Sequence, residues 1–100
     1  MAETITKVRQ SNDVTTTKPG RFKVVFYNDD TTPMDFVILL LMKIFRHNEN
    51  AAVNLTMKVH NEGSAIAGVY TYEVAEQKGM EATNLSRQNG YALVIKVEAE

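Results

Sequence analysis

The sequence contains no cysteine, and its few glycines and prolines are scattered. Without cysteine there is no disulfide framework, no thiolate zinc site and no thiol nucleophile, which fits a reducing compartment. The five glycines do not gather in a loop ahead of a helix, so a phosphate-binding loop is missing as well. Neither charge sign is in excess, because the formal net charge is -1. This balance argues against a protein that owes its affinity to nucleic-acid phosphates or to an anionic membrane.

Long hydrophobic runs are also missing. The most apolar run, residues 36–42, is far shorter than the roughly 20 residues that span a bilayer, and it is internal. We therefore expect neither a signal peptide nor a membrane span. With 100 residues, of which 44% are apolar, the chain is long enough for one hydrophobic core and too short for a second domain.

Residues 1–20 differ in composition from the rest of the chain. They are rich in Thr, Lys, Asn and Ser, show no sustained apolar period and end in Pro19-Gly20. Such a segment buries too little apolar surface to offset its ordering entropy. The sequence predicts a flexible, slightly basic extension over residues 1–20 and one folded domain over residues 21–100.

Apolar periodicity predicts six elements in the folded domain. Thr32 and Pro33 supply an N-cap and a first helical residue for the first helix, while Gly63 and Gly90 end the second and third helices. The predicted elements are a strand over residues 21–28, a helix over 33–45, a helix over 49–61, a strand over 65–70, a helix over 71–89 and a strand over 93–98. Their order, β-α-α-β-α-β, indicates an α+β domain in which a small three-stranded antiparallel sheet packs against three helices.

The densest polar cluster, Asn28-Asp29-Asp30, lies between the first predicted strand and the first predicted helix. Asn and Asp are favoured in turns for their local hydrogen bonds, so a plain turn is one interpretation. His60 lies near the end of the second predicted helix, where a histidine is often a cap or a surface residue. The other interpretation is that these polar side chains form the rim of a small pocket above apolar side chains. Such a pocket suits a cation attached to an apolar group.

Enzyme chemistry has weaker support in the sequence. His47, His60 and the aspartates lie on different elements without the spacing of a metal site, and no Gly-x-Ser-x-Gly motif marks a nucleophile. A hydrolase that uses Asp29, Asp30 and His60 stays open as an alternative, although a domain of this size offers little depth for a substrate cleft. We expect no enzymatic activity, no cofactor and no bound metal.

Three segments, taken in order, match the motifs of one protein family. Residues 28–37, Asn-Asp-Asp-Thr-Thr-Pro-Met-Asp-Phe-Val, are similar to Asn-Asp-Asp-aromatic-Thr-Pro-Met-Glu-Phe-Val. Residues 59–63 match Val-His-x-x-Gly, and residues 68–76, Gly-Val-Tyr-Thr-Tyr-Glu-Val-Ala-Glu, are similar to Gly-Val-Phe-Thr-x-Glu-Val-Ala-Glu. Through these motifs, over about residues 22–98, the chain resembles the ClpS family of protease adaptors.

The resemblance implies a function in the bacterial N-end rule. ClpS adaptors bind N-degrons, which are proteins that begin with a large hydrophobic residue such as Leu, Phe, Tyr or Trp, and deliver them to the ClpA- or ClpC-type AAA+ unfoldase of the Clp protease. By this resemblance the substrate's α-amino group is held by Asn28, by Asp29 or Asp30, and by His60. The first side chain then enters a hydrophobic pocket lined by Thr32, Met34, Val37, Thr56, Val59 and Leu93.

The same resemblance implies the other partners and the location. Glu73 and Lys78 match positions that contact the N-terminal domain of the unfoldase, and residues 1–20 match the extension that the unfoldase engages. We expect a monomer in the bacterial cytoplasm, or in an organelle stroma if the chain is of plastid type. No nucleic-acid or membrane partner is expected.

The chain departs from the family pattern at three places. Thr56 stands where the family commonly has a methionine that packs over the pocket and disfavours β-branched first residues. Thr31 replaces an aromatic residue, and Gly90-Tyr91-Ala92 replaces a more polar, proline-containing loop. A general protein-interaction domain is the alternative to an adaptor, because the C-terminal domain of the ribosomal stalk protein has a similar architecture without these motifs.

Overall fold

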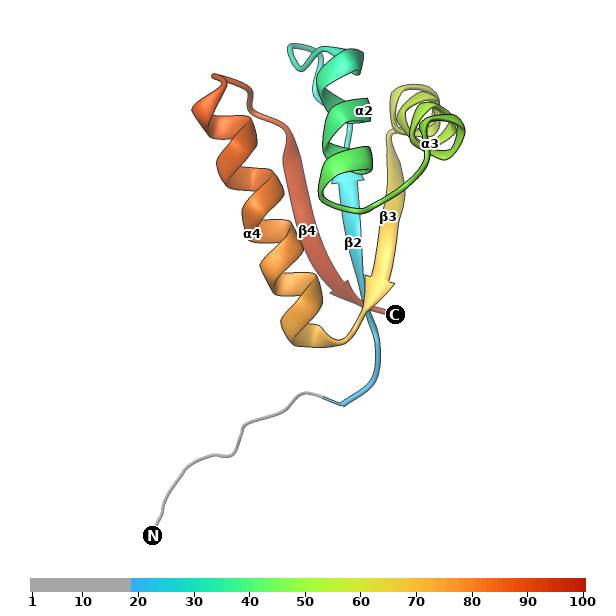
Figure 1. The fold of residues 1–100 in the computed structure, drawn as a ribbon, viewed down its shortest axis with the longest axis vertical. Coiled ribbons are helices and arrows are strands. Elements are labelled where there is room, and N and C mark those ends of the chain that lie inside the picture. Colours follow the sequence, from blue (N-terminus) through green and yellow to red (C-terminus); the bar gives the residue numbers. More distant parts are fainter. Residues whose placement is uncertain (1–18) are drawn as a thin grey trace, which may run out of the picture.

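The computed structural model describes residues 19–100, which form three strands and three helices (Figure 1). Their bounds are β2 Phe22–Tyr27, α2 Met34–Lys43, α3 Glu49–Glu62, β3 Ser64–Tyr70, α4 Tyr72–Gln88 and β4 Val94–Ala99. The predicted α+β class and the order β-α-α-β-α-β are confirmed. The extension predicted over residues 1–20 lies outside the described residues, apart from Pro19 and Gly20.

The sheet has the order β3-β2-β4, and both strand pairs are antiparallel. The first strand is therefore the central one, which the linear order of the elements does not reveal. Figure 1 shows the three helices along the sheet, with α2 in front of β2, α4 beside β4 and α3 beside β3. Phe22, Val24 and Phe26 alternate along β2 and pack with this helical layer.

Val25 shows that a central strand buries residues on both of its faces. It is 5% exposed although it lies outside the core cluster, because Ile66 of β3 and Lys96 of β4 are its partners on either side. The register with β3 shifts next to Val25, which leaves Ala67 as an extra residue. The His47 side chain contacts the backbone oxygen of Ala67 at 2.5 Å and so ties the loop before α3 to this bulge.

The core lies between the sheet and the three helices. Phe26, Leu40 and Leu41 are each at most 1% exposed, and the ring of Phe26 meets the ring of Phe45 edge to face at a centroid distance of 5.4 Å. This arrangement joins the central strand to the end of the apolar helix α2. Burial accounts for only part of the apolar character of α2, because Leu39 and Met42 of the same helix are exposed.

The start of α2 corrects one sequence prediction. Thr32 was expected to cap the helix with Pro33 as its first residue, but the helix begins at Met34 and Pro33 occupies the N-cap position without a side-chain hydrogen bond. Proline has no N–H, so one unsatisfied donor of the first turn is absent, and its extended backbone (ψ 144°) ends the preceding turn. The Thr32 hydroxyl is bonded to Asp29 instead.

Helix α3 has a capping residue at each end, of which Gly63 was predicted from the sequence and Asn48 was not. The Asn48 side chain accepts a hydrogen bond from the Ala51 N–H at 2.8 Å, and Gly63 ends the helix with a positive φ of 93°. Because Gly63 leads directly into β3, the last turn of α3 is held beside the sheet. His60 lies in that turn.

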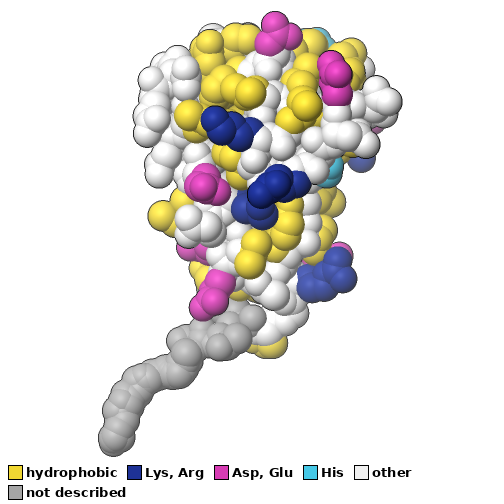
Figure 2. All heavy atoms as spheres, in the orientation of Figure 1, with side chains coloured by type: hydrophobic (Ala, Val, Ile, Leu, Met, Phe, Trp, Pro, Cys, Tyr) yellow, Lys and Arg dark blue, Asp and Glu magenta, His cyan; other side chains and the backbone are white. Residues whose placement is uncertain are grey.

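Charged side chains are interspersed with apolar ones on the face shown in Figure 2. No extensive patch of one charge is visible there, in keeping with the formal net charge of -1. Within residues 19–100, no helix combines the length and the apolar character needed to cross a bilayer.

Candidate functional site

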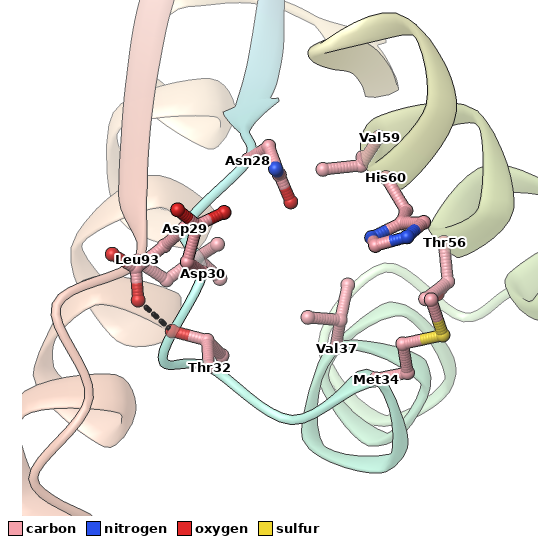
Figure 3. A pocket seen from close by; sticks show the side chains of 10 residues that line it. All are labelled: Asn28, Asp29, Asp30, Thr32, Met34, Val37, Thr56, Val59, His60 and Leu93. Atoms are coloured by element: carbon pink, nitrogen blue, oxygen red, sulfur yellow. Dashed lines mark hydrogen bonds between the residues drawn. The ribbon is translucent and has the colours of Figure 1, made fainter.

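A cavity of about 180 Å³ opens where the β2–α2 turn, α2, α3 and the loop before β4 meet (Figure 3). All ten residues that the sequence analysis assigned to substrate binding line this cavity. They are Asn28, Asp29, Asp30, Thr32, Met34, Val37, Thr56, Val59, His60 and Leu93. These residues are up to 65 positions apart in the chain, so the fold alone brings them together.

Polar side chains form the rim of the cavity, which we define as Asn28, Asp29, Asp30 and His60. Asn28 follows β2, and its backbone N–H donates to the Gly63 carbonyl at 2.9 Å. This bond fixes the end of the central strand against the end of α3. Figure 3 shows the Asn28 and His60 side chains directed toward the same space from different elements.

Asp29 is the rim residue with the most local hydrogen bonds. Its Oδ2 atom accepts hydrogen bonds from the Thr32 hydroxyl at 2.6 Å and from the Thr31 hydroxyl at 2.8 Å. These two hydroxyls hold the pKa of the Asp29 carboxyl below its ordinary value because they stabilise the ionised form. The Thr32 hydroxyl makes the larger contribution and the Thr31 hydroxyl the next largest. The half-buried Asp29 is therefore a fixed negative charge at the rim at neutral pH.

Asp30 is adjacent in sequence and different in environment. Its side chain is exposed, and within residues 19–100 no hydrogen bond or ion pair joins it to another residue. The two neighbouring carboxylates are therefore not equivalent. Asp29 is held in one orientation, whereas Asp30 is free to turn in solvent.

The floor of the cavity is apolar and buried. It consists of Val37, Thr56, Val59 and Leu93, each no more than 5% exposed. The Thr56 hydroxyl donates to the Ala52 carbonyl at 2.8 Å inside α3, so the floor carries no unpaired hydroxyl at this position. The cavity thus combines an anionic, hydrogen-bonding rim with an apolar interior.

The loop before β4 is held in place by Arg87, to which the sequence analysis gave no role, and by the ring of Tyr91. The Arg87 guanidinium donates to the carbonyl oxygens of Tyr91 at 3.0 Å and Leu93 at 2.9 Å. The Tyr91 ring also packs edge to face against Phe36 of α2, at 4.8 Å between centroids. These contacts position Leu93, and no local sequence pattern predicts them because the partners come from three different elements.

Glu73 and Lys78, which were assigned to an unfoldase contact, lie on α4 and do not line the cavity. Glu73 is exposed in the first turn. Lys78 is half-buried, and its Nζ donates to the Ile44 carbonyl at 2.8 Å while lying 5.4 Å from the centre of the Tyr70 ring. Lys78 therefore has a structural role, because its cation binds the C-terminal end of α2.

The described residues do not meet the requirements of a metal site. The described residues contain no group of three or more His, Cys, Asp or Glu side chains arranged to hold a metal ion. His47 is turned toward Ala67 of β3 and is not part of the cavity lining.

Known proteins are similar to this chain in sequence and in fold. The family model described as "ATP-dependent Clp protease adaptor protein ClpS" matches residues 17–96. A ClpS adapter protein of Nautilia profundicola is 48% identical over 93 residues, which are 93% of this chain and 96% of that protein. The ClpS adapter protein of Helicobacter hepaticus is 37% identical over 93 residues, which are 93% of this chain and 94% of that protein.

A solved structure gives the same result for the fold. Agrobacterium tumefaciens ClpS2 bound to L-phenylalaninamide superimposes with a TM-score of 0.80 at 37% sequence identity. The match covers 83% of this chain and all of that one. The sequence motifs, the α+β fold and these matches agree, and the chain belongs to the ClpS family of ATP-dependent Clp protease adaptor proteins.

Proposed function

We propose that this chain binds the first residue of proteins that begin with Leu, Phe, Tyr or Trp and delivers them to a ClpA- or ClpC-type unfoldase. The observation that carries this proposal is the cavity with a hydrogen-bonding rim and an apolar floor. Its volume of about 180 Å³ exceeds the roughly 150 Å³ that accommodates benzene in an engineered protein cavity. The space is therefore sufficient for one large side chain.

The rim is suited to an α-ammonium group. An ammonium has three hydrogen-bond donors, so it needs several acceptors that converge on one point. The side-chain oxygen of Asn28, the Asp29 carboxylate and a neutral His60 imidazole can supply three. Each charge-assisted bond contributes about 1.5–3 kcal/mol. Burial of a Leu or Phe side chain below the rim adds roughly 1.5–3 kcal/mol, which favours these residues over Ala or Gly.

The ligand of the Agrobacterium protein supports this proposal. L-Phenylalaninamide has a free amino group and a benzyl side chain, so it has the chemistry of an amino-terminal phenylalanine. The ten cavity-lining residues here offer partners for both of its ends.

The proposal is tested by titrating the protein with three peptides that differ only in the first residue or its α-amino group. One begins with Leu, one is its acetylated twin, and one begins with Ala. We expect measurable binding of the first alone, because acetylation removes the charge and two donors, and Ala leaves the floor unfilled. Equal binding of the free and acetylated peptides would contradict an ammonium site.

Binding should weaken as the pH falls because of His60. A neutral imidazole accepts a hydrogen bond from an ammonium, whereas a protonated imidazole repels it. Affinity for the Leu peptide, measured by calorimetry, should therefore be lower at about pH 5.5 than at about pH 7, where the α-amino group of the peptide is still mostly protonated. In His60→Ala this difference should shrink, while His47→Gln, which lies outside the cavity, should retain it. Equal affinity of the wild-type protein at both pH values would exclude this role of His60.

Thr56 should widen the range of accepted first residues. Its side chain is short and its hydroxyl is bonded within α3, so a β-branched residue meets a methyl group at the floor. Thr56→Met should weaken binding of Ile and Val peptides by about tenfold, since overpacking costs 1–3 kcal/mol, and should change Leu binding little. A panel of peptides beginning with Leu, Phe, Tyr, Trp, Ile, Val and Met measures this. Thr56→Val, of similar shape, is the matched control, and an unchanged profile in Thr56→Met would refute the idea.

The unfoldase is proposed to bind at α4, away from the cavity, through Glu73 and Lys78. Glu73→Lys is the better probe, because Lys78 also holds the end of α2. This variant should bind the Leu peptide normally and lose affinity for the unfoldase's N-terminal domain; undiminished affinity would remove Glu73 from the interface.

We further propose that residues 1–20 form the delivery extension, and that the protein acts as a monomer in the bacterial cytoplasm.

A further inference from the structure

Thr31 lies outside the cavity lining, yet its hydroxyl is bonded to a residue of the rim. The Thr31 hydroxyl donates to Asp29 Oδ2 at 2.8 Å, beside the 2.6 Å bond from the Thr32 hydroxyl to the same atom. The backbone N–H of Thr32 also donates to the Asp29 carbonyl at 3.2 Å and closes the turn. The Asp29 carboxylate is therefore held by its own turn, before any ligand is present.

The two hydroxyls act on one oxygen atom and leave the other available. An ionised carboxylate offers about four lone-pair sites, so bonds from Thr31 and Thr32 to Oδ2 leave Oδ1 free to accept from a ligand. A protonated carboxyl group would accept fewer bonds and would offer no charge to a cation. Rotation of the Asp29 side chain toward solvent would break both hydroxyl bonds, so these bonds orient the carboxylate as well as favouring its charge.

We propose that Thr31 is a positioning residue for substrate binding, which holds the Asp29 carboxylate oriented toward the α-ammonium group. This inference rests on the proposed function, because it assigns Asp29 to the ammonium. The Thr31 hydroxyl is exposed, so its hydrogen bond contributes little to the free energy of unfolding. Its effect lies in the preorganisation of a charged acceptor, which reduces the cost of ordering that acceptor on binding.

The charged groups near Asp29 come from several elements. Asp30 is next in the chain, and its side chain is exposed. Asp35 lies in the first turn of α2, and His60 faces the cavity from α3. On the α4 side, Arg87 is engaged by the carbonyls of the loop before β4. No cation of these elements is bonded to Asp29, so its charge is favoured mainly by the hydroxyls of Thr32 and Thr31, with smaller contributions from the backbone N–H groups of the same two residues.

The test measures the carboxyl group and the binding site separately. The 13C signal of the Asp29 side chain is followed by NMR from about pH 7 to about pH 2.5 in the wild-type protein and in Thr31→Val. Loss of the hydroxyl should move the midpoint of the titration to higher pH, because one of the groups that stabilise the ionised form is gone. Thr31→Ser retains a hydroxyl and should restore the wild-type midpoint. Thr71→Val, at an exposed threonine whose side chain makes no capping bond, is the control.

Binding of the Leu peptide is then measured in the same variants. Thr31→Val should weaken binding by about threefold at neutral pH, the size expected for one hydrogen bond. An unchanged Asp29 midpoint in Thr31→Val would overturn the proposal even if the peptide binds. A shifted midpoint with unaltered binding at every pH would also overturn it, because the carboxylate would then not be the acceptor. If no variant binds the peptide, the proposed function fails, whereas the NMR titration still reports on the Thr31–Asp29 pair.

Discussion

Replacing Asp29 with asparagine is expected to weaken binding of a Leu peptide by at least about thirtyfold, the lower end of the range for removal of one partner of a desolvated charge pair. The substitution keeps the size of the side chain and removes its charge. It leaves the substrate's ammonium beside a neutral amide whose NH₂ group can also donate, and a donor repels an ammonium. Fluorescence anisotropy with a labelled peptide at about pH 7.5 measures the loss.

Asp30→Asn is the matched control for this prediction. It makes the same chemical change one residue later, at a side chain that is exposed and without a hydrogen bond to any of the described residues. We expect at most about a threefold loss, because the Asp30 charge is screened by solvent. If Asp30→Asn were the more damaging variant, the ammonium acceptor would be Asp30, and the orientation of Asp29 by Thr31 and Thr32 would serve only the turn.

Replacing Phe26 with alanine is expected to lower the free energy of unfolding by about 3–5 kcal/mol. Phe26 lies on the central strand, is 1% exposed and contacts the Phe45 ring edge to face. Truncation removes this contact and leaves a cavity between the sheet and the helices. Since domains of this size are stable by about 5–15 kcal/mol, a sizeable fraction of the variant should be unfolded at moderate urea concentrations. Urea denaturation followed by circular dichroism gives the difference.

Two control variants show whether the loss of stability comes from the cavity in the core or from any removal of an apolar side chain. Met80→Ala removes a side chain that is 58% exposed on α4, and its cost should stay within about 0.5 kcal/mol. Phe26→Leu keeps most of the buried volume and should cost clearly less than Phe26→Ala. A Phe26→Ala variant as stable as the wild-type protein would show that the core tolerates or refills this space.

Local sequence signals predicted the elements well because each depends on residues close in the chain. Alternation of apolar residues predicted β2. Gly63 predicted the end of α3, because glycine readily adopts the positive φ that is found there. The N-cap prediction for α2 was wrong, because the helix begins one residue later and Pro33 occupies the N-cap position. The Thr32 hydroxyl belongs to the preceding turn, where it donates to the carboxylate of Asp29, three residues earlier. Propensity ranks such alternatives, and only the turn geometry selects one.

The candidate site could be assigned from the sequence to the extent that its residue types and motifs specify chemistry. Acidic and amide side chains after a strand, a histidine at the end of a helix and apolar residues at helical spacing were enough to propose a site for a cation with an apolar group. The relation between Asp29 and Asp30 could not be predicted, since adjacent identical residues carry no local signal of different environments. The contact of Lys78 with the Ile44 carbonyl, 34 residues away, could not be predicted either.

By itself the sequence determined which residues form strands and helices, which side chains offer charge or apolar surface, and which family motifs they match. The tertiary structure decided the rest: the central place of β2, the burial of Val25 on its outer face, and the meeting of ten distant side chains at one cavity. The physical reason is the distance along the chain over which each interaction acts. Periodicity and capping act within a few residues, whereas strand order, register and the choice among hydrogen-bond acceptors depend on contacts that exist only after the chain has folded.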